Sequence, residues 1–228
     1  MAANGLTDPA AITAGDSLTI PDASSTPPPT PSPTPTPENP VGTDLLVPIA
    51  GACLASDSNL LPDAPRVYRF GVHEGMDFYS HDNCVAVPEG ADVLAVKAGT
   101  VIRADHGFVE MTAAELDELL TRVETQGYTD ADALDRFRGR QVWVDHGGGI
   151  VTRYSHLGGI PENIEEGNAV SAGELIGFVG DSGTPEAVTA PGIENHLHLE
   201  IRVGDSYLGE GLPEDQIRYL YEQVFSGS

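Results

Sequence analysis

The segment NHLHLE, residues 195–200, carries two histidines separated by a single residue. Side chains at positions i and i+2 of a β-strand point to the same face, so His196 and His198 would share one face, with Leu197 and Leu199 on the other. Two imidazoles on one face suit a metal site, or a metal ligand beside a group that transfers protons. Two surface histidines at a strand edge would give the same motif.

Two further stretches carry residues that could meet this histidine pair. The stretch GVHEGMDFYS places His73 and Asp77 four residues apart, with a glycine between them. Imidazole and carboxylate are both zinc ligands, so this stretch could supply half of a zinc site. The stretch TRYSHL places His156 after a run rich in β-branched residues. Taken singly, each stretch is also explained by a surface histidine, a turn-forming aspartate or a packed histidine.

Taken together, the three elements resemble the lysostaphin and LytM-type zinc endopeptidases of bacterial cell walls. The resemblance extends from about Tyr68 to Arg202, which is most of the expected folded part. It is specific, because several independent motifs agree in order and spacing. These motifs are HEGMDF, VLAVKAGTV, VDHGGGIVTRYSHL, GNAVSAGELIGFVGDSGT and HLHLEIR.

The resemblance implies a role for each site residue. His73, Asp77 and His198 would hold one Zn²⁺ per chain and leave a fourth position open for water. His156 and His196 would stay unbound, one as the general base and the other as stabiliser of the oxyanion or acid for the leaving amine. Which of the two is the base stays open.

The function that the resemblance implies is hydrolysis of peptide bonds in peptidoglycan, either in cross-bridges or in stem peptides. One alternative is a non-catalytic domain of the same fold that binds or activates another cell-wall hydrolase. Relatives of that kind have lost metal ligands, whereas all five site residues are present in this chain. A glycan-binding wall protein without activity is the other alternative.

The elements that would position these residues are mainly strands. Two stretches, 91–105 and 141–157, each contain two β-branched runs broken by glycine, and HLHLEIRV alternates as a strand does. Many short strands with glycine turns predict a mainly β domain, a compact antiparallel β-sandwich or barrel-like hybrid. The resemblance implies the duplicated hybrid motif type of this architecture.

Three helices are expected beside the strands. Thr112 and Glu115 form a capping-box pattern ahead of an apolar stripe, and a second helix is expected to begin at Thr129. These two helices make up an insert, residues 108–139, where the family has a short link. The insert contains no His or Cys, so we expect it to pack beside the groove without entering the metal site. A C-terminal helix is expected from Pro213 as its first residue.

Two more departures from the family pattern are a long loop before the histidine pair, residues 181–195, and the two cysteines, Cys53 and Cys84. In an oxidising compartment two cysteines of one small domain usually pair, so we expect a Cys53–Cys84 disulfide. Two free thiols are the alternative, because a sequence does not fix pairing.

The chain divides by composition into three parts. Residues 1–21 resemble the C-terminal half of a LysM module, the small repeat that binds peptidoglycan or chitin. Residues 22–42 form a Pro/Thr/Ser-rich linker, which favours extended polyproline II. Residues 43–228 would be the zinc endopeptidase domain with its insert. Since the expected upstream half of the LysM module is missing, Met1 is interpreted as an internal methionine of a truncated chain.

The charge of the chain excludes some functions. The 228 residues include 35 acidic and 11 basic side chains, a net charge of −24, so the chain should be repelled by nucleic acid and by anionic membranes. No apolar run is long enough to span a membrane, and no signal peptide is visible. We expect a monomeric protein that is extracellular or associated with the cell wall and contacts peptidoglycan peptides.

Overall fold

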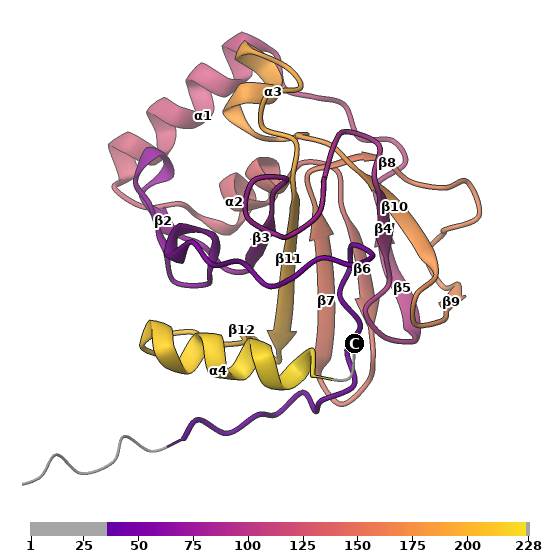
Figure 1. The fold of residues 1–228 in the computed structure, drawn as a ribbon. Helices are drawn as coiled ribbons and strands as arrows, with labels where there is room; N and C mark the ends of the chain where they lie inside the picture. Colours follow the sequence, from indigo (N-terminus) through magenta and orange to yellow (C-terminus); the bar gives the residue numbers. More distant parts are fainter. Residues whose placement is uncertain (1–35, 227–228) are drawn as a thin grey trace, which may run out of the picture. The chain divides into compact units, whose positions relative to one another are not determined.

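The computed structural model describes residues 36–226 (Figure 1). The LysM-like region, 1–21, and most of the linker, 22–42, lie outside the described residues. The described part is mainly β, as the sequence predicts, with helices grouped at the ends of the sheets. Within it, no helix has the length and apolar character needed to cross a membrane.

The largest sheet has seven strands, and all of its pairings are antiparallel. One edge of strand β11 is shared by β3 and β12, and its other edge pairs with β7. The described strands do not close into a barrel. In spatial order the strands are β12 (Ser206–Tyr207), β11 (Leu197–Val203), β7 (Ile150–Ser155), β6 (Val142–Asp145), β5 (Gly99–Ala104) and β9 (Ala169–Val170), with β3 (Met76–Phe78) beside β11.

A second, three-stranded sheet shares its core with the first. Its strands are β4 (Asp92–Leu94), β10 (Leu175–Val179) and β8 (Leu157–Gly159). Val93 and Ile176 from the small sheet and Val144 from the large sheet belong to one buried cluster. A separate hairpin is formed by β1 (Pro65–Arg66) and β2 (Gly71–Val72). The expectation of compact antiparallel layers is therefore confirmed.

Strand β11 shows why the histidine pair lies where it does. Leu197, Leu199 and Ile201 are fully buried in the main core. The alternate residues of the strand, which include His198 and Glu200, therefore lie on the opposite face. The alternation of NHLHLE thus sets the orientation of both histidines, as the sequence predicts.

The helices differ from the expected ones mainly at their first residues. Helix α1 (Ala113–Gln126) has the predicted capping box of Thr112 and Glu115. Helix α2 (Ala131–Arg138) is capped by Asp130, so the expectation of Thr129 is wrong by one residue. The Asp130 side chain accepts from the backbone N–H of Ala133, whereas the Thr129 hydroxyl donates to the carbonyl of Arg69.

The remaining helices are short or terminal. Helix α4 (Glu214–Val224) begins one residue later than expected, because Pro213 has extended ψ and is the N-cap. Helix α3 (Pro185–Thr189) lies in the long loop and was not expected. Two 3₁₀ turns, η3 (Ser58–Leu60) and η4 (Val67–Arg69), precede the site.

The insert and the long loop form a single wall. The insert has its own hydrophobic cluster, and Val188 of α3 packs against it. The Gly183 N–H donates to the Glu110 carboxylate over 2.9 Å. At Gly139, a Cβ atom would lie only 2.1 Å from the carbonyl oxygen of Ser182, so the end of the insert needs glycine to approach the loop. Figure 1 shows α1 and α3 side by side above the sheet. We call residues 108–139 and 181–195 together the insert wall.

The expected disulfide is present and joins the segment before η3 to the loop after β3. Cys53 and Cys84 are bonded across a sequence separation of 31 residues. A loop of this size lowers the entropy of the unfolded chain enough to stabilise the domain by roughly 3 to 4 kcal/mol. We expect the Cys53→Ser/Cys84→Ser double variant to lose that free energy of unfolding in chemical denaturation. An unchanged denaturation midpoint, with two bonded cysteines verified in the wild type by thiol counting, would contradict this.

Candidate metal centre

Strands β3 and β11 and the turn before β3 bring the expected metal ligands together. Asp77 lies in the middle of β3 and is the direct cross-strand partner of His198 on β11. His73 lies just before β3, at the end of the hairpin. The turn between His73 and Asp77 passes closely over β11, since a Cβ atom on Gly75 would lie 2.3 Å from the carbonyl oxygen of Leu199. Glycine at this position therefore permits the contact.

The three ligand atoms form a small triangle in the interior. His73 Nε2 lies 2.9 Å from Asp77 Oδ1 and 2.8 Å from His198 Nδ1, and the third edge, from His198 Nδ1 to Asp77 Oδ1, is 2.8 Å. All three residues are buried, with His198 the most exposed at 6%. Among the described residues this trio is the one group of His, Cys, Asp and Glu side chains close enough to share a metal ion.

The hydrogen bonds of the two rings show that this triangle fits a cation. His73 Nδ1 lies 2.9 Å from the carbonyl oxygen of Leu61, and His198 Nε2 lies 3.2 Å from Glu200 Oε1. Both of these oxygens accept, so the outer nitrogens carry protons, and in the neutral form of each ring the inner nitrogen presents a lone pair. Two lone pairs and a carboxylate oxygen then face one another, which is favourable only with a positive charge between them. Two nitrogens and one oxygen are a zinc donor set, with outer partners that fix the ring tautomers.

Asp77 is held on its other side by an arginine. Arg66 Nη2 donates to Asp77 Oδ2 over 2.9 Å, while Arg66 Nη1 donates to the carbonyl of Asn59. Burial by itself would raise the pKa of Asp77, but the neighbouring His73 and His198 outweigh it and hold the pKa well below its usual range. Burial also lowers the pKa of His73 to about 4. At neutral pH the site therefore offers an anionic carboxylate and a neutral His73 ring.

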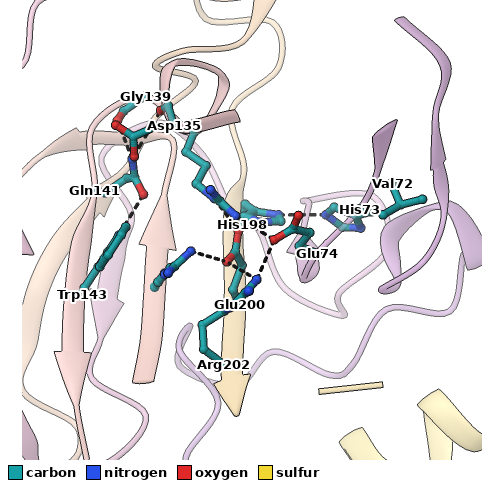
Figure 2. Close-up of polar contacts among 12 residues, drawn as sticks. Val72, His73, Glu74, Asp135, Gly139, Gln141, Trp143, His198, Glu200 and Arg202 are labelled. Carbon is teal, nitrogen blue, oxygen red and sulfur yellow. Dashed lines mark hydrogen bonds and ion pairs between the residues drawn. The ribbon is translucent and has the colours of Figure 1, made fainter. Parts of the chain in front are cut away.

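Glu200 anchors the outer side of His198, and the sequence reasoning missed it (Figure 2). Its side chain is fully buried and is surrounded by three arginines. The alternation of HLHLEIR could have found it, because that pattern puts Glu200 on the face of His198. The ion pairs run from Glu200 to Arg138 Nε at 2.5 Å, to Arg153 Nη1 at 3.3 Å and to Arg202 Nη1 at 3.4 Å.

Arg138 joins the insert to this network. It is the last residue of α2, and it also binds Glu74 at 2.9 Å. No atom of the insert belongs to the ligand triangle, as expected. However, the expectation that the insert stays beside the site was incomplete, since Arg138 contacts the carboxylate that holds His198.

We expect Glu200→Gln to weaken zinc binding about 10- to 100-fold, the usual cost of losing an outer partner of a metal-bound histidine. The matched control is Glu74→Gln, because Glu74 binds Arg138 and Arg202 but has no contact with His198. Competition with a zinc-binding dye measures both affinities. Equal losses in the two variants would show that the loss reflects the arginine network and not the orientation of His198.

The two histidines that are not in the triangle lie beside it. The ring centroids of His156 and His196 are 4.5 Å apart, and His196 Nε2 lies 3.9 Å from Asp77 Oδ1. His196 is stacked on Tyr79 with centroids 4.3 Å apart, and its Nδ1 donates to the carbonyl of Glu194 over 2.6 Å. The stacking and the hydrogen bond fix the orientation of this ring.

His156 is held by the insert wall. Its backbone N–H donates to the carbonyl of Arg138 over 2.9 Å, and its Nδ1 donates to the carbonyl of Ser182 over 2.8 Å. Its φ of 61° is a left-handed conformation that a residue with a side chain seldom adopts, and this turn follows β7 directly. Burial lowers the pKa of both His156 and His196, so each ring is neutral at pH 7 and its Nε2 can accept a proton.

A pocket of about 520 Å³ opens over these five residues. His146, His106 and His81 are not among its lining residues. His146 follows β6 and contacts the carbonyl of Ala98 and the hydroxyl of Thr152, so its ring is engaged at the end of that strand. The structure therefore separates the five candidate site residues from the other histidines by position alone.

A family model described as peptidase family M23 matches residues 71–209 of this chain. This span contains His73, Asp77, His156, His196 and His198. A comparison with curated protein sequences found no significant match.

Solved structures that resemble the chain come from several bacteria. A Pseudomonas aeruginosa protein assigned to peptidase M23 is 22% identical with a TM-score of 0.43, over 80% of this chain and 53% of that one. A zinc-containing peptidase from Vibrio cholerae is 19% identical with a TM-score of 0.44, over 75% of this chain and 41% of that one. The lysostaphin catalytic domain from Staphylococcus simulans is 19% identical with a TM-score of 0.38, over 66% of this chain and 80% of that one. This chain thus spans about half the length of the first two proteins.

Proposed function

The chain belongs to peptidase family M23, and we propose that it is a zinc-dependent endopeptidase that cuts peptide bonds in bacterial peptidoglycan, in cross-bridges or stem peptides. The observation that carries the proposal is the triangle of His73 Nε2, Asp77 Oδ1 and His198 Nδ1, in which two ring nitrogens and a carboxylate oxygen converge with edges of 2.8–2.9 Å. One Zn²⁺ per chain would complete this triangle and leave a position open towards the pocket.

The residues around the metal position would divide the chemistry among them. When bound, zinc supplies a Lewis acid for the scissile carbonyl and lowers the pKa of water. The Nε2 atoms of His156 and His196 have no hydrogen-bond partner among the described residues and are neutral at pH 7, so one accepts the proton of the attacking water. The ring that has taken this proton can pass it to the leaving amine, whereas the other ring donates to the developing oxyanion only after its Nε2 takes up a proton from solvent, because its own proton lies on Nδ1. Glu200 and the Leu61 carbonyl keep the two ligand rings in their metal-binding tautomers.

The surrounding chain suggests where the enzyme works. The disulfide suits an oxidising compartment, and we propose an extracellular or wall-associated protein. In this proposal residues 1–21 belong to a LysM-like anchor, residues 22–42 form a tether and residues 43–228 carry the activity. A tether of this kind keeps a hydrolase at a high effective concentration near the polymer that anchors it.

Two measurements on the purified protein test this function. Elemental analysis should find about one zinc per chain, and mass spectrometry should find new amino termini in peptidoglycan of defined composition. Zinc binding without any cleavage of peptidoglycan or glycine-rich peptides would support the non-catalytic alternative, a partner of another hydrolase. Absence of both zinc binding and cleavage would overturn the proposed metal site.

A further inference from the structure

One buried arginine in the pocket lining has no carboxylate partner. The described residues include all ten arginines of the chain, and eight of them form an ion pair with an aspartate or glutamate. The two exceptions are Arg140, which lies outside the pocket, and Arg69, which lines it and is only 6% exposed. A buried cation normally needs an opposite charge, and this chain has 35 acidic side chains to supply one. The missing partner of Arg69 is therefore a feature to explain.

The guanidinium of Arg69 is held close to the metal position. Arg69 ends η4, between the two strands of the β1–β2 hairpin, and its Nη2 donates to the carbonyl of Val72 over 2.6 Å. Val72 is joined directly to the proposed ligand His73 (Figure 2). With ordinary bond lengths, Arg69 Nη2 therefore lies at most about 10 Å from His73 Nε2, which is the span of roughly three residues of an extended peptide.

The hairpin leaves room for this guanidinium without neutralising it. A Cβ atom on Gly71 would lie 2.6 Å from Arg69 Nη1, so a side chain at position 71 would displace the charged group. The other polar neighbour of the guanidinium is the Tyr68 hydroxyl, which is uncharged at neutral pH. Burial, and also the nearby charge of Arg66, lower the pKa of Arg69. Arginine nevertheless stays protonated in proteins, so the pocket keeps an unneutralised positive charge here.

The remaining charges of the lining do not fill this role. The other two arginines of the lining, Arg66 and Arg138, are engaged by carboxylates of the site. Glu186, on α3, also lines the pocket but forms no ion pair with Arg69. A carboxylate that enters the pocket would therefore find Arg69 as a cation without a competing anion in contact. The pairs that engage the other two arginines are Arg66–Asp77, Arg138–Glu74 and Arg138–Glu200.

We propose that Arg69 is a carboxylate-binding subsite, whose guanidinium anchors a free carboxylate of the substrate peptide within about three residues of the scissile bond. This inference rests on the proposed function, because the metal position marks the scissile bond, and it narrows the substrate. A glycine cross-bridge is uncharged and would leave Arg69 without a partner. A stem peptide with a free carboxylate, on a side chain or at a chain terminus, would supply one. The subsite therefore favours stem peptides.

The test uses peptide hydroxamates, whose metal-binding group holds them at the zinc position without turnover. One series carries glutamate or the uncharged glutamine at successive positions on either side of the hydroxamate, and calorimetry on the zinc-loaded full chain gives each Kd. We expect glutamate to bind at least about tenfold more tightly than glutamine at one of these positions, the usual gain from a hydrogen bond between charged groups. A second series, ending in a free α-carboxylate or its amide, distinguishes a side-chain carboxylate from a terminal one.

Variants locate the effect. Arg69→Met should lower the ratio of glutamate to glutamine affinity towards one and leave glutamine binding and zinc content unchanged. Arg69→Lys keeps the charge but loses the planar fork, so its ratio should be intermediate. The matched control is Arg140→Met, which changes the net charge equally at an arginine that contacts the carbonyl of Gly158 outside the pocket, and it should keep the wild-type ratio. If Arg69→Met does not fold, the ratio in Arg69→Lys decides.

The outcomes separate the subsite from the function. Equal affinities of the charged and uncharged peptides in both series, or a preference that is unchanged in the folded Arg69 variants, would overturn the subsite. A preference lost in Arg69→Met and kept in Arg140→Met would support it even if no peptide is cut, in which case the proposed hydrolase activity alone fails. If no hydroxamate binds to zinc-loaded protein, the subsite is overturned together with its reference point.

Discussion

His156→Ala and His196→Ala are each expected to retain zinc and to lower the rate of peptide cleavage by at least about 100-fold, the usual size of a lost general acid or base. Neither ring belongs to the ligand triangle. The Nδ1 atom of each ring donates to a backbone carbonyl and not to one of the three metal-ligating residues. Zinc content by elemental analysis and cleavage rate, measured on the same samples, check this expectation.

Variants of the three metal-ligating residues should lose zinc as well as activity. His73→Ala, Asp77→Ala and His198→Ala each remove one of three protein bonds to the metal, so zinc content and activity should fall together. Chelation of the wild type should abolish turnover, and added Zn²⁺ should restore it. His146→Ala is the matched histidine control, because its ring makes two hydrogen bonds outside the pocket. Loss of zinc from His156→Ala or His196→Ala would show that the division of roles is wrong.

Arg138→Ala is expected to lower the free energy of unfolding by about 3 to 5 kcal/mol, because it removes the closest cation from a fully buried carboxylate. The Arg138 side chain is 8% exposed and binds both Glu200 and Glu74. The matched control is Arg122→Ala in the same insert. Arg122 is 37% exposed and binds Asp130 and Asp132 at the surface, so its loss should cost only about 0.2 to 1 kcal/mol.

Chemical denaturation in the presence of a chelator separates these two effects from metal binding. If Arg138→Ala and Arg122→Ala lost the same free energy of unfolding, the Glu200 network would not hold the insert to the sheet. Arg138→Lys provides a further check, because it keeps the charge but loses the two-sided contact to Glu74 and Glu200. Its stability should lie between those of the wild type and Arg138→Ala.

Much of the candidate site follows from local sequence. A period of two in NHLHLE puts His198 and the three core residues of β11 on opposite faces, because side chains of a strand must alternate. The glycine between His73 and Asp77 belongs to a motif of the family and lies where the turn meets β11. The capping box of α1 was also predictable, since it needs only Thr112 and Glu115 three residues apart.

The ends of helices were less predictable than their existence. Thr129 and Asp130 are both good N-caps, and the choice between them depends on Arg69, a residue distant in sequence that accepts a hydrogen bond from Thr129. Helix α3 has only five residues, which is too short for a helical period to be visible in the sequence. In both cases the deciding contacts come from other parts of the chain.

The sequence by itself determined the five candidate site residues, the mainly β fold, the place of the insert and the cysteines available to pair. Tertiary structure alone decided that the insert and the loop before β11 pack into one wall, and that Arg138 reaches Glu200 behind His198. The physical reason is the range of the interactions. Strand alternation and helix capping depend on residues that are close in sequence. An apolar helix face or a buried arginine requires a partner elsewhere in the chain, and the sequence alone does not identify that partner.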